Sequence, residues 1–199
     1  MRVFVAGATG AIGRPLVSAL VAAGHRVGAL TRSTERAVAL AGHGIEPIVG
    51  DIYSHELADR VAAFGPDAVI HQVTGLPSRE ALVPLRLLAL NKARTRGVDA
   101  LLDAARSAGA TRFIAQSVAF PLPPIAASAV RHLEASTLDF PGIVARYGRF
   151  YGPRTWSEDA PKSGPIVHVE TAAQATVELL AAEPGIYEVT DEGTVALLD

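Results

Sequence analysis

The sequence predicts an α/β protein built on a doubly wound parallel sheet flanked by helices. Short apolar runs recur along the chain and alternate with helical patterns, which is typical of successive βαβ units. The first run, residues 3–6, passes straight into a turn that holds Gly7, Gly10 and Gly13, and an apolar helical pattern then extends to Gly24. A strand, a glycine turn and a helix in this order are typical of the first unit of such a sheet.

The remaining elements follow from apolar runs separated by glycine, proline and polar turns. Strands of a parallel sheet are short and continuously apolar because helices cover both of their faces. Such runs predict strands at residues 3–6, 26–31, 46–49, 68–71, 110–117, 142–146 and 185–189. Helical patterns predict helices directly after the glycine turn, at 33–41, in a segment ending at residue 64, and at 78–107, 126–136 and 171–182, with an irregular polar segment at 154–165.

Each glycine of the first turn has a separate physical role. Gly7 allows a tight exit from the strand, Gly10 lets backbone N–H groups approach a pyrophosphate, and Gly13 lets the helix pack close to the sheet. The helix N-terminus adds unpaired donors and a partial positive charge, which favour phosphate. The alternative is that small residues only form a tight strand-to-helix connection. We predict a Rossmann-type dinucleotide site that includes Gly7, Ala8, Thr9, Gly10, Ala11, Ile12 and Gly13.

The end of the second expected strand predicts which dinucleotide binds. An acidic residue there would accept hydrogen bonds from the adenosine ribose and favour NAD. This chain instead has Thr31, Arg32 and Ser33, with Arg36 one helical turn further on. Guanidinium groups pair well with the oxygens of a 2′-phosphate, so the sequence favours NADP(H) over NAD(H). The alternative is that Arg32 and Arg36 are solvated charges at the start of a helix.

Two further loops are expected at the same edge of the sheet, because the carboxyl ends of parallel strands lie together. Asp51 follows the third strand and is a candidate acceptor for the adenine amino group, with Ile52 against the ring. Spacing alone equally allows Asp51 to cap the next helix. After the fourth strand, the loop formed by Gln72, Val73 and Thr74 is expected beside the nicotinamide ribose.

The long helical segment at 78–107 is unusually apolar. Residues 82–90 are apolar nearly all round, whereas a helix that packs on one face of a sheet normally keeps a polar side. In a chain of 199 residues, we expect this helix to form a homodimer contact. Asn91 interrupts the apolar run, and an amide at that depth needs hydrogen-bond partners.

Composition limits the size, the partners and the environment of the protein. A length of 199 residues is enough for one well-buried core, so we predict a single domain over residues 1–199. A net charge of −2 gives no indication of a nucleic acid or an anionic membrane as partner. The sequence has no cysteine, no apolar stretch long enough for a membrane span and no signal-peptide pattern, so we expect a cytoplasmic protein. Its six histidines are scattered, without the spacing of a metal site.

Several weak motifs occur in a fixed order along the chain. They are the glycine turn 7–13, Gly50-Asp51, the strand end 69–71, Asn91 in the long helix, the strand 113–117, the stretch 146–153 and residues 168–170. This ordered set resembles the extended short-chain dehydrogenase/reductase family, the NAD-dependent epimerase and dehydratase group. The resemblance covers about residues 1–190, and it implies that Ser117 is the serine at the end of the catalytic strand. It also implies a carbonyl compound or a nucleotide sugar as the small-molecule substrate.

Two features of the chain depart from that family. The family's chemistry uses a tyrosine followed four residues later by a lysine, a pair that transfers the proton and holds the nicotinamide ribose. The chain has only two lysines, Lys92 and Lys162, and neither follows a tyrosine at that spacing. The C-terminal region is also short, and the loops 119–127 and 151–168 are the expected remnants of the substrate-binding part.

The candidate catalytic residues are those that remain once this pair is missing. Ser117 is placed to hydrogen-bond a substrate carbonyl, Tyr151 is a candidate proton donor, and Asn91 occupies the family's position in the long helix. The alternatives are a serine that satisfies local backbone groups and a tyrosine that packs in the floor of the site. Two functions stay open: an NAD(P)-binding oxidoreductase or epimerase-like enzyme, and a non-catalytic NADP(H)-binding sensor or regulatory protein.

Overall fold

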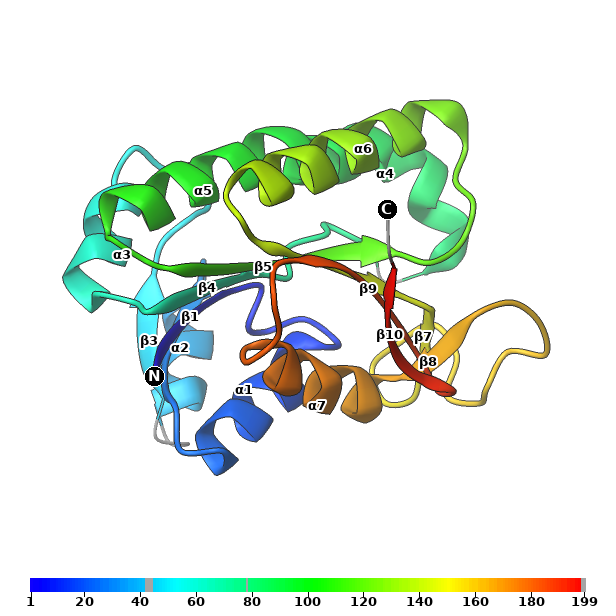
Figure 1. The fold of residues 1–199 in the computed structure, drawn as a ribbon, viewed down its shortest axis with the longest axis horizontal. Coiled ribbons are helices and arrows are strands. Elements are labelled where there is room, and N and C mark those ends of the chain that lie inside the picture. Colours follow the sequence, from blue (N-terminus) through cyan, green and yellow to red (C-terminus); the bar gives the residue numbers. More distant parts are fainter. Residues whose placement is uncertain (42–44, 78, 198–199) are drawn as a thin grey trace.

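A mostly parallel sheet of eight strands forms the centre of the computed structural model, which describes residues 1–41, 45–77 and 79–197 (Figure 1). The strands lie in the order β10-β9-β6-β5-β4-β1-β2-β3, and every neighbouring pair is parallel except β10 with β9. They span Arg2–Ala6 (β1), Arg26–Thr31 (β2), Glu46–Val49 (β3), Ala68–His71 (β4), Arg112–Val118 (β5), Ile143–Tyr147 (β6), Gly185–Thr190 (β9) and Gly193–Leu197 (β10). The predicted doubly wound parallel sheet is confirmed.

Helices cover both faces of this sheet, as Figure 1 shows. One face carries α1 (Gly13–Ala22), α2 (Thr34–Ala41) and α7 (Val169–Leu179). The other carries α3 (Leu57–Phe64), α5 (Val98–Ser107) and α6 (Pro124–Asp139), with α4 (Val83–Lys92) packed beside α6. None of the helices described here is both long enough and apolar enough to cross a membrane.

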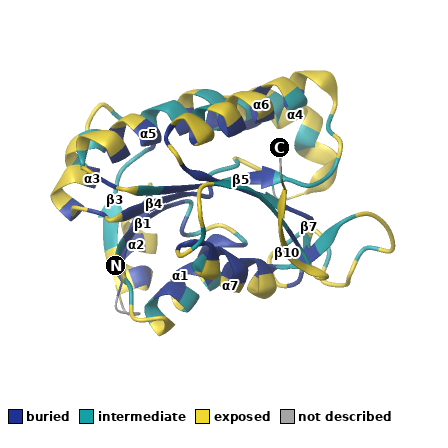
Figure 2. Ribbon diagram, viewed as in Figure 1, coloured by how far each residue is buried: buried dark blue, intermediate teal, exposed yellow. Residues whose placement is uncertain are grey.

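The two helical layers enclose two hydrophobic clusters, one on each face of the sheet. Successive side chains of a strand point to opposite faces. Along β1, Val3 and Val5 therefore join the cluster beneath α1 and α7, while Phe4 and Ala6 join the cluster beneath α3 and α5. Figure 2 shows the inner strands buried between helices whose outer faces are exposed. This double burial explains why the strands read as continuous apolar runs in the sequence.

The strand order reverses next to β1, and this positions the site. Strand β1 pairs with β2 on one side and with β4 on the other, so the connections after β1 and β4 leave toward opposite faces. Ligands of open α/β sheets bind in the crevice at such a reversal, beyond the carboxyl ends of the strands. All loops predicted to bind the cofactor leave from the carboxyl ends of β1, β2, β3 and β4.

The prediction of one long helix at 78–107 is wrong in detail. A 3₁₀ turn (Glu80–Leu82) and α4 come first, a π-helical turn (Ala93–Gly97) follows, and α5 completes the segment; residue 78 lies outside the described residues. Pro84 is accommodated within the first turn of α4, where its missing N–H has no helical partner to lose. Gly97 lies in the π-helical turn, where an added Cβ would be 3.7 Å from Nε2 of His71.

Two short strands near the C-terminus were not predicted. Strand β7 (Arg149–Tyr151) pairs in parallel with β8 (Ile166–His168), and residues 152–165 form the connection between them. Strand β10 lies at the edge of the main sheet with all its side chains exposed. Strands this short or this exposed carry no apolar signal of their own, since their formation depends on the neighbouring strand.

Candidate cofactor and substrate site

The glycine turn has the geometry that a dinucleotide cradle requires. Gly7 has a φ of 95°, and a Cβ placed there would lie 2.6 Å from the backbone of Gln72. A Cβ on Gly13 would lie 2.1 Å from the carbonyl oxygen of Gly7, so only glycine lets α1 start this close to β1. The N–H of Gly10 donates to the carbonyl of Gly7 at 3.0 Å and closes the turn. These residues fit a bound pyrophosphate at the N-terminus of α1.

The loop between β2 and α2 brings the predicted basic residues to the same edge. Thr31 is buried, and its Oγ1 accepts a hydrogen bond from the N–H of Ser33 at 3.3 Å. The Ser33 hydroxyl accepts in turn from the N–H of Arg36 at 3.2 Å, which caps the start of α2. The side chains of Arg32 and Arg36 are exposed beyond the carboxyl end of β2.

Asp51 shapes a turn and does not cap the next helix. Its Oδ1 accepts from the N–H of Tyr53 at 2.9 Å, and its carbonyl accepts from the N–H of Ser54. Glu56 occupies the N-cap position of α3, without a side-chain capping bond. The carboxylate of Asp51 is half-buried, next to the buried side chain of Ile52. The structure therefore excludes the capping interpretation for this residue, and the contact to adenine stays a prediction.

The loop that follows β4 lies directly against the glycine turn. The N–H of Gln72 donates to the carbonyl of Ala6 at 2.8 Å, and the same backbone approaches Gly7. The buried side chain of Gln72 donates through Nε2 to the hydroxyl of Tyr147 at 3.4 Å. Val73 packs partly buried against the core, and Thr74 accepts a hydrogen bond from the N–H of residue 76. The first and fourth loops are thus brought together, as the sequence predicted.

His71 is a buried residue beneath these loops and not an accessible base. It is 1% exposed at the carboxyl end of β4. Burial lowers its pKa to about 4, although nearby backbone groups, including that of Ala93, act in the opposite direction. The imidazole is therefore neutral near pH 7 and faces the π-helical turn at Gly97.

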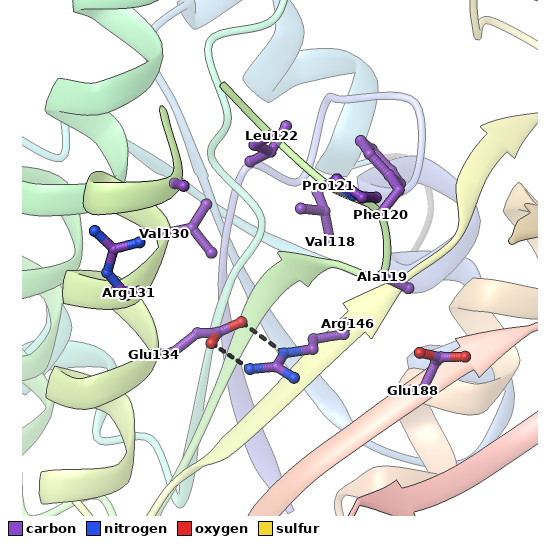
Figure 3. Close-up of a pocket in the computed structure, with 11 residues that line it drawn as sticks. Val118, Ala119, Phe120, Pro121, Leu122, Val130, Arg131, Glu134, Arg146 and Glu188 are labelled. Carbon is purple, nitrogen blue, oxygen red and sulfur yellow. Dashed lines mark hydrogen bonds and ion pairs between the residues drawn. The ribbon is translucent and has the colours of Figure 1, made fainter. Parts of the chain in front are cut away.

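Ser117 is directed toward a buried ion pair, which corrects the expectation that its hydroxyl would meet a substrate carbonyl. The hydroxyl is buried and donates to Oε1 of Glu134 at 2.5 Å. Glu134, on α6, also accepts two hydrogen bonds from the guanidinium of Arg146 on β6, at 2.8 and 2.6 Å (Figure 3). Sequence reasoning missed Glu134 as a partner, because residues on a helix and on two strands meet only in the folded chain.

The other two candidate catalytic residues also have structural partners. Tyr151 donates from its hydroxyl to Oδ2 of Asp191 at 2.8 Å, and this hydrogen bond is the main cause that raises its pKa. A raised pKa makes the phenol a weaker acid, which disfavours the proposed proton donor. Asn91 donates through Nδ2 to the carbonyl of Ile125 at 3.4 Å and so connects α4 with the start of α6.

A surface pocket of about 340 Å³ opens beside the carboxyl ends of β5 and β6 (Figure 3). The β5–α6 loop and α6 supply its apolar lining, and charged groups border it. The lining residues are Val118, Ala119, Phe120, Pro121, Leu122, Ala127, Val130, Arg131, Glu134, Arg146 and Glu188. A second pocket of about 420 Å³ shares Phe120 and Pro121 and is closed by Arg149, Pro161 and residues 163–165. The loops 119–127 and 151–168 thus line two adjoining pockets.

The described residues hold no group of three or more histidine, aspartate or glutamate side chains that could bind a metal ion. The chemistry of the site therefore has to be argued from the cradle, the pocket and the ion pair next to it.

Comparison with known proteins agrees with this geometry. Residues 7–129 match a family described as NAD(P)H-binding. A curated relative from a Streptomyces species, a 3-diazoavenalumate denitrifying reductase, is 36% identical over 236 residues that cover 96% of this chain and 76% of the relative. A ketoreductase from Stigmatella aurantiaca that acts on a 4-hydroxy-2-methyl-3-oxo-4-farnesyl-3,4-dihydroquinoline-1-oxide is 35% identical over 57% of this chain and 32% of its own.

Solved structures give the same fold. UDP-glucose 4-epimerase from Thermus thermophilus in complex with NAD superposes with a TM-score of 0.77 at 20% identity, over 98% of this chain and 79% of the epimerase. The aligned stretch in the Streptomyces relative is longer than this whole chain, so the relative carries insertions within it. The chain belongs to the NAD(P)H-binding family, and it is an NAD(P)-dependent enzyme of the oxidoreductase and epimerase type, built on the fold of the extended short-chain dehydrogenases/reductases.

Proposed function

We propose that the protein is an NADPH-dependent reductase whose substrate binds in the pocket between the β5–α6 loop and α6. The single observation that carries this proposal is the chemistry of the pocket lining. Among the described residues that line it, none is a tyrosine, a lysine or a histidine. The nearby hydroxyl of Ser117 is already bound to Glu134.

The preference for NADPH rests on the residues at the end of β2. Thr31 and Ser33 are held by local hydrogen bonds, while the guanidinium groups of Arg32 and Arg36 extend from the same loop. No carboxylate of the described residues is paired with either arginine. A 2′-phosphate would supply the missing anion, so Arg32→Ala is expected to weaken NADPH binding by about tenfold and to leave NADH binding unchanged.

The absence of a proton donor limits the type of reduction. Hydride addition to a ketone produces an alkoxide, which the enzyme must protonate. Reduction of a substrate that expels a neutral leaving group produces no such anion. The pocket in this chain therefore suits a hydride acceptor with a leaving group better than it suits a carbonyl.

The Streptomyces relative points to one such acceptor, since its name describes reduction of a diazo compound with loss of nitrogen. We propose an aromatic diazonium compound as the substrate class. Hydride from C4 of the bound nicotinamide would replace dinitrogen: the C–N bond breaks with its electron pair leaving on nitrogen, and a C–H bond forms with the hydride pair. The apolar lining around Phe120, Leu122 and Val130 would hold the ring and exclude water.

Deuterium transfer tests this reaction directly. The purified protein is incubated with NADPH deuterated at C4 and with 4-carboxybenzenediazonium, and the benzoate formed is analysed by mass spectrometry against a reaction without protein. Enzyme-dependent benzoate that carries deuterium on the ring supports the proposal. Parallel reactions with an aromatic aldehyde and with UDP-glucose identify a carbonyl reductase or an epimerase, and turnover of only one of these would contradict the diazonium substrate.

A pocket variant separates the substrate site from the cofactor site. Val130→Trp would fill the pocket from α6, since Val130 lines it and is otherwise buried against the helix. We expect turnover to fall at least tenfold while NADPH affinity stays within twofold. Ala135→Trp, on the exposed side of the same helix, is the matched control and is expected to keep full turnover.

The quaternary state and the limits of the domain complete the proposal. Leu85 and Leu88 of α4 are 80% and 86% exposed, and Ile125 at the start of α6 is 66% exposed. These side chains support a homodimer contact through α4 and α6. We further propose that residues 1–199 form one domain, and the cytoplasmic location expected from the sequence stays a prediction.

A further inference from the structure

Three arginines from distant parts of the chain meet near the phosphate cradle. Arg14 lies in the first turn of α1, and its Nε donates to the carbonyl of Thr9 across the glycine turn at 3.4 Å. Arg36 lies in the first turn of α2, at the neighbouring carboxyl end. Arg154 belongs to the connection between β7 and β8, on the substrate side of the molecule.

The charges of these side chains act on one another. Burial lowers the pKa of Arg14, and the positive charges of Arg154 and Arg36 lower it further. Among the described residues, no carboxylate forms an ion pair with any of the three. Three guanidinium groups within electrostatic reach of one another repel, and an anion placed among them would turn that repulsion into attraction.

Arg154 is held in place by a turn that is costly for its own backbone. Its φ is +67°, in the left-handed region that side chains other than glycine rarely adopt. The turn is closed by hydrogen bonds from the N–H of Gly152 to the carbonyl of Ser157 at 2.9 Å and from Thr155 Oγ1 to the same carbonyl at 2.6 Å. Trp156 ties it to the loop after β4 by donating from Nε1 to the carbonyl of Pro77 at 2.9 Å. Strain of this kind persists where the surroundings over-determine the conformation, as at ligand clamps.

We propose that Arg14, Arg36 and Arg154 form a clamp for a phosphate group of the dinucleotide, with Arg154 as the arm supplied by the substrate-side loop. This inference rests on the proposed function, since it needs a bound dinucleotide. Guanidinium groups bind phosphate oxygens through paired hydrogen bonds, and the N-terminus of α1 favours the same anion. Because Arg154 and the pocket residues 161–165 belong to one connection, the bound cofactor would hold that connection in position for the substrate. The cofactor would then bind before the substrate.

The test uses Arg154→Gly, a variant chosen to separate binding from folding. Glycine adopts a φ of +67° without strain, so the variant is expected to keep or slightly raise its thermal stability while losing the guanidinium. Trp156 is the only tryptophan of the chain and lies in the same turn, so energy transfer from it to bound NADPH reports occupancy. Lys162→Gly removes a positive charge from the same connection and is the matched control.

Four ligands show which phosphate is held: NADPH, NADH, 2′,5′-ADP and ADP, the last two measured by displacement of NADPH. We expect Arg154→Gly to raise the Kd of NADPH by about tenfold or more, and Lys162→Gly to leave it within twofold. A rise for NADPH and 2′,5′-ADP alone places the clamp on the 2′-phosphate, and a rise for all four places it on the 5′-phosphates. Unchanged affinities in Arg154→Gly, beside normal NADPH binding by the parent protein, would overturn the clamp but not the proposed function. A parent protein that binds none of the four would overturn both.

Discussion

His71 gives the fold a dependence on pH that can be measured directly. The folded protein holds this imidazole in a dry position with a pKa of about 4, against an ordinary value of 6.5 in the unfolded chain. Between these values the unfolded chain binds more protons than the folded one, so stability falls as the pH falls from 6.5 toward 4. Above pH 6.5 both states are neutral at this residue, and it costs nothing.

The size of the effect follows from the difference between the two pKa values. Proton linkage gives a loss of about 2 kcal/mol between pH 7 and pH 5, and about 3 kcal/mol once the pH reaches 4. We expect His71→Leu, which has a similar volume and cannot titrate, to lose much less stability over the same range. His55→Gln, at an exposed position, is the control and should behave like the parent protein.

Urea unfolding at pH 7 and at pH 5, followed by circular dichroism, measures both free energies. Titration of other groups contributes equally to the parent and to His71→Leu, so the difference between their pH slopes isolates this residue. Equal losses of stability in the two proteins would refute a buried neutral imidazole as the cause.

Three further predictions concern the cradle, the ion pair and the exposed helix. Gly13→Ala places a Cβ against the carbonyl of Gly7, so we expect loss of NADPH binding in a fluorescence titration together with a lower thermal midpoint; an alanine variant that binds normally would contradict the cradle. Glu134→Ala leaves the partly buried Arg146 without its carboxylate, and we expect a loss of about 2 to 3 kcal/mol in urea unfolding, recovered in part by Glu134→Gln. Leu88→Glu should convert the expected dimer to a monomer in light scattering, and a parent protein that is already monomeric at micromolar concentration would end that proposal.

The sequence predicted most of the central sheet because burial on both faces leaves a direct signal. Strands β2, β3 and β4 begin and end where their apolar runs do, and the other inner strands differ by one or two residues. The glycine turn was equally readable, since Gly7 and Gly13 are required by backbone contacts within a few residues or with the adjacent loop. Such local constraints appear in a sequence as fixed residue types at fixed spacings.

Contacts between distant segments could not be read in the same way. Ser117 had the position expected of a catalytic serine, but its direction depends on Glu134 and Arg146, which lie on other elements. The approach of Arg154 to Arg14 depends on a turn with a rare backbone conformation, for which an arginine gives no sequence signal. The π-helical turn depends likewise on a tertiary contact, the packing of Gly97 over the buried His71.

The paired hydrogen bonds between Glu134 and Arg146 fix the position of α6 through its C-terminal half. The residues of α6 that border the pocket, Ala127, Val130 and Arg131, lie in the turns before this anchor. Orientation of the helix and chemistry of its pocket face are therefore assigned to different residues. Substitutions at the pocket face can change which molecule is reduced while the helix stays attached to β6, so this enzyme can acquire new substrates without rebuilding its scaffold.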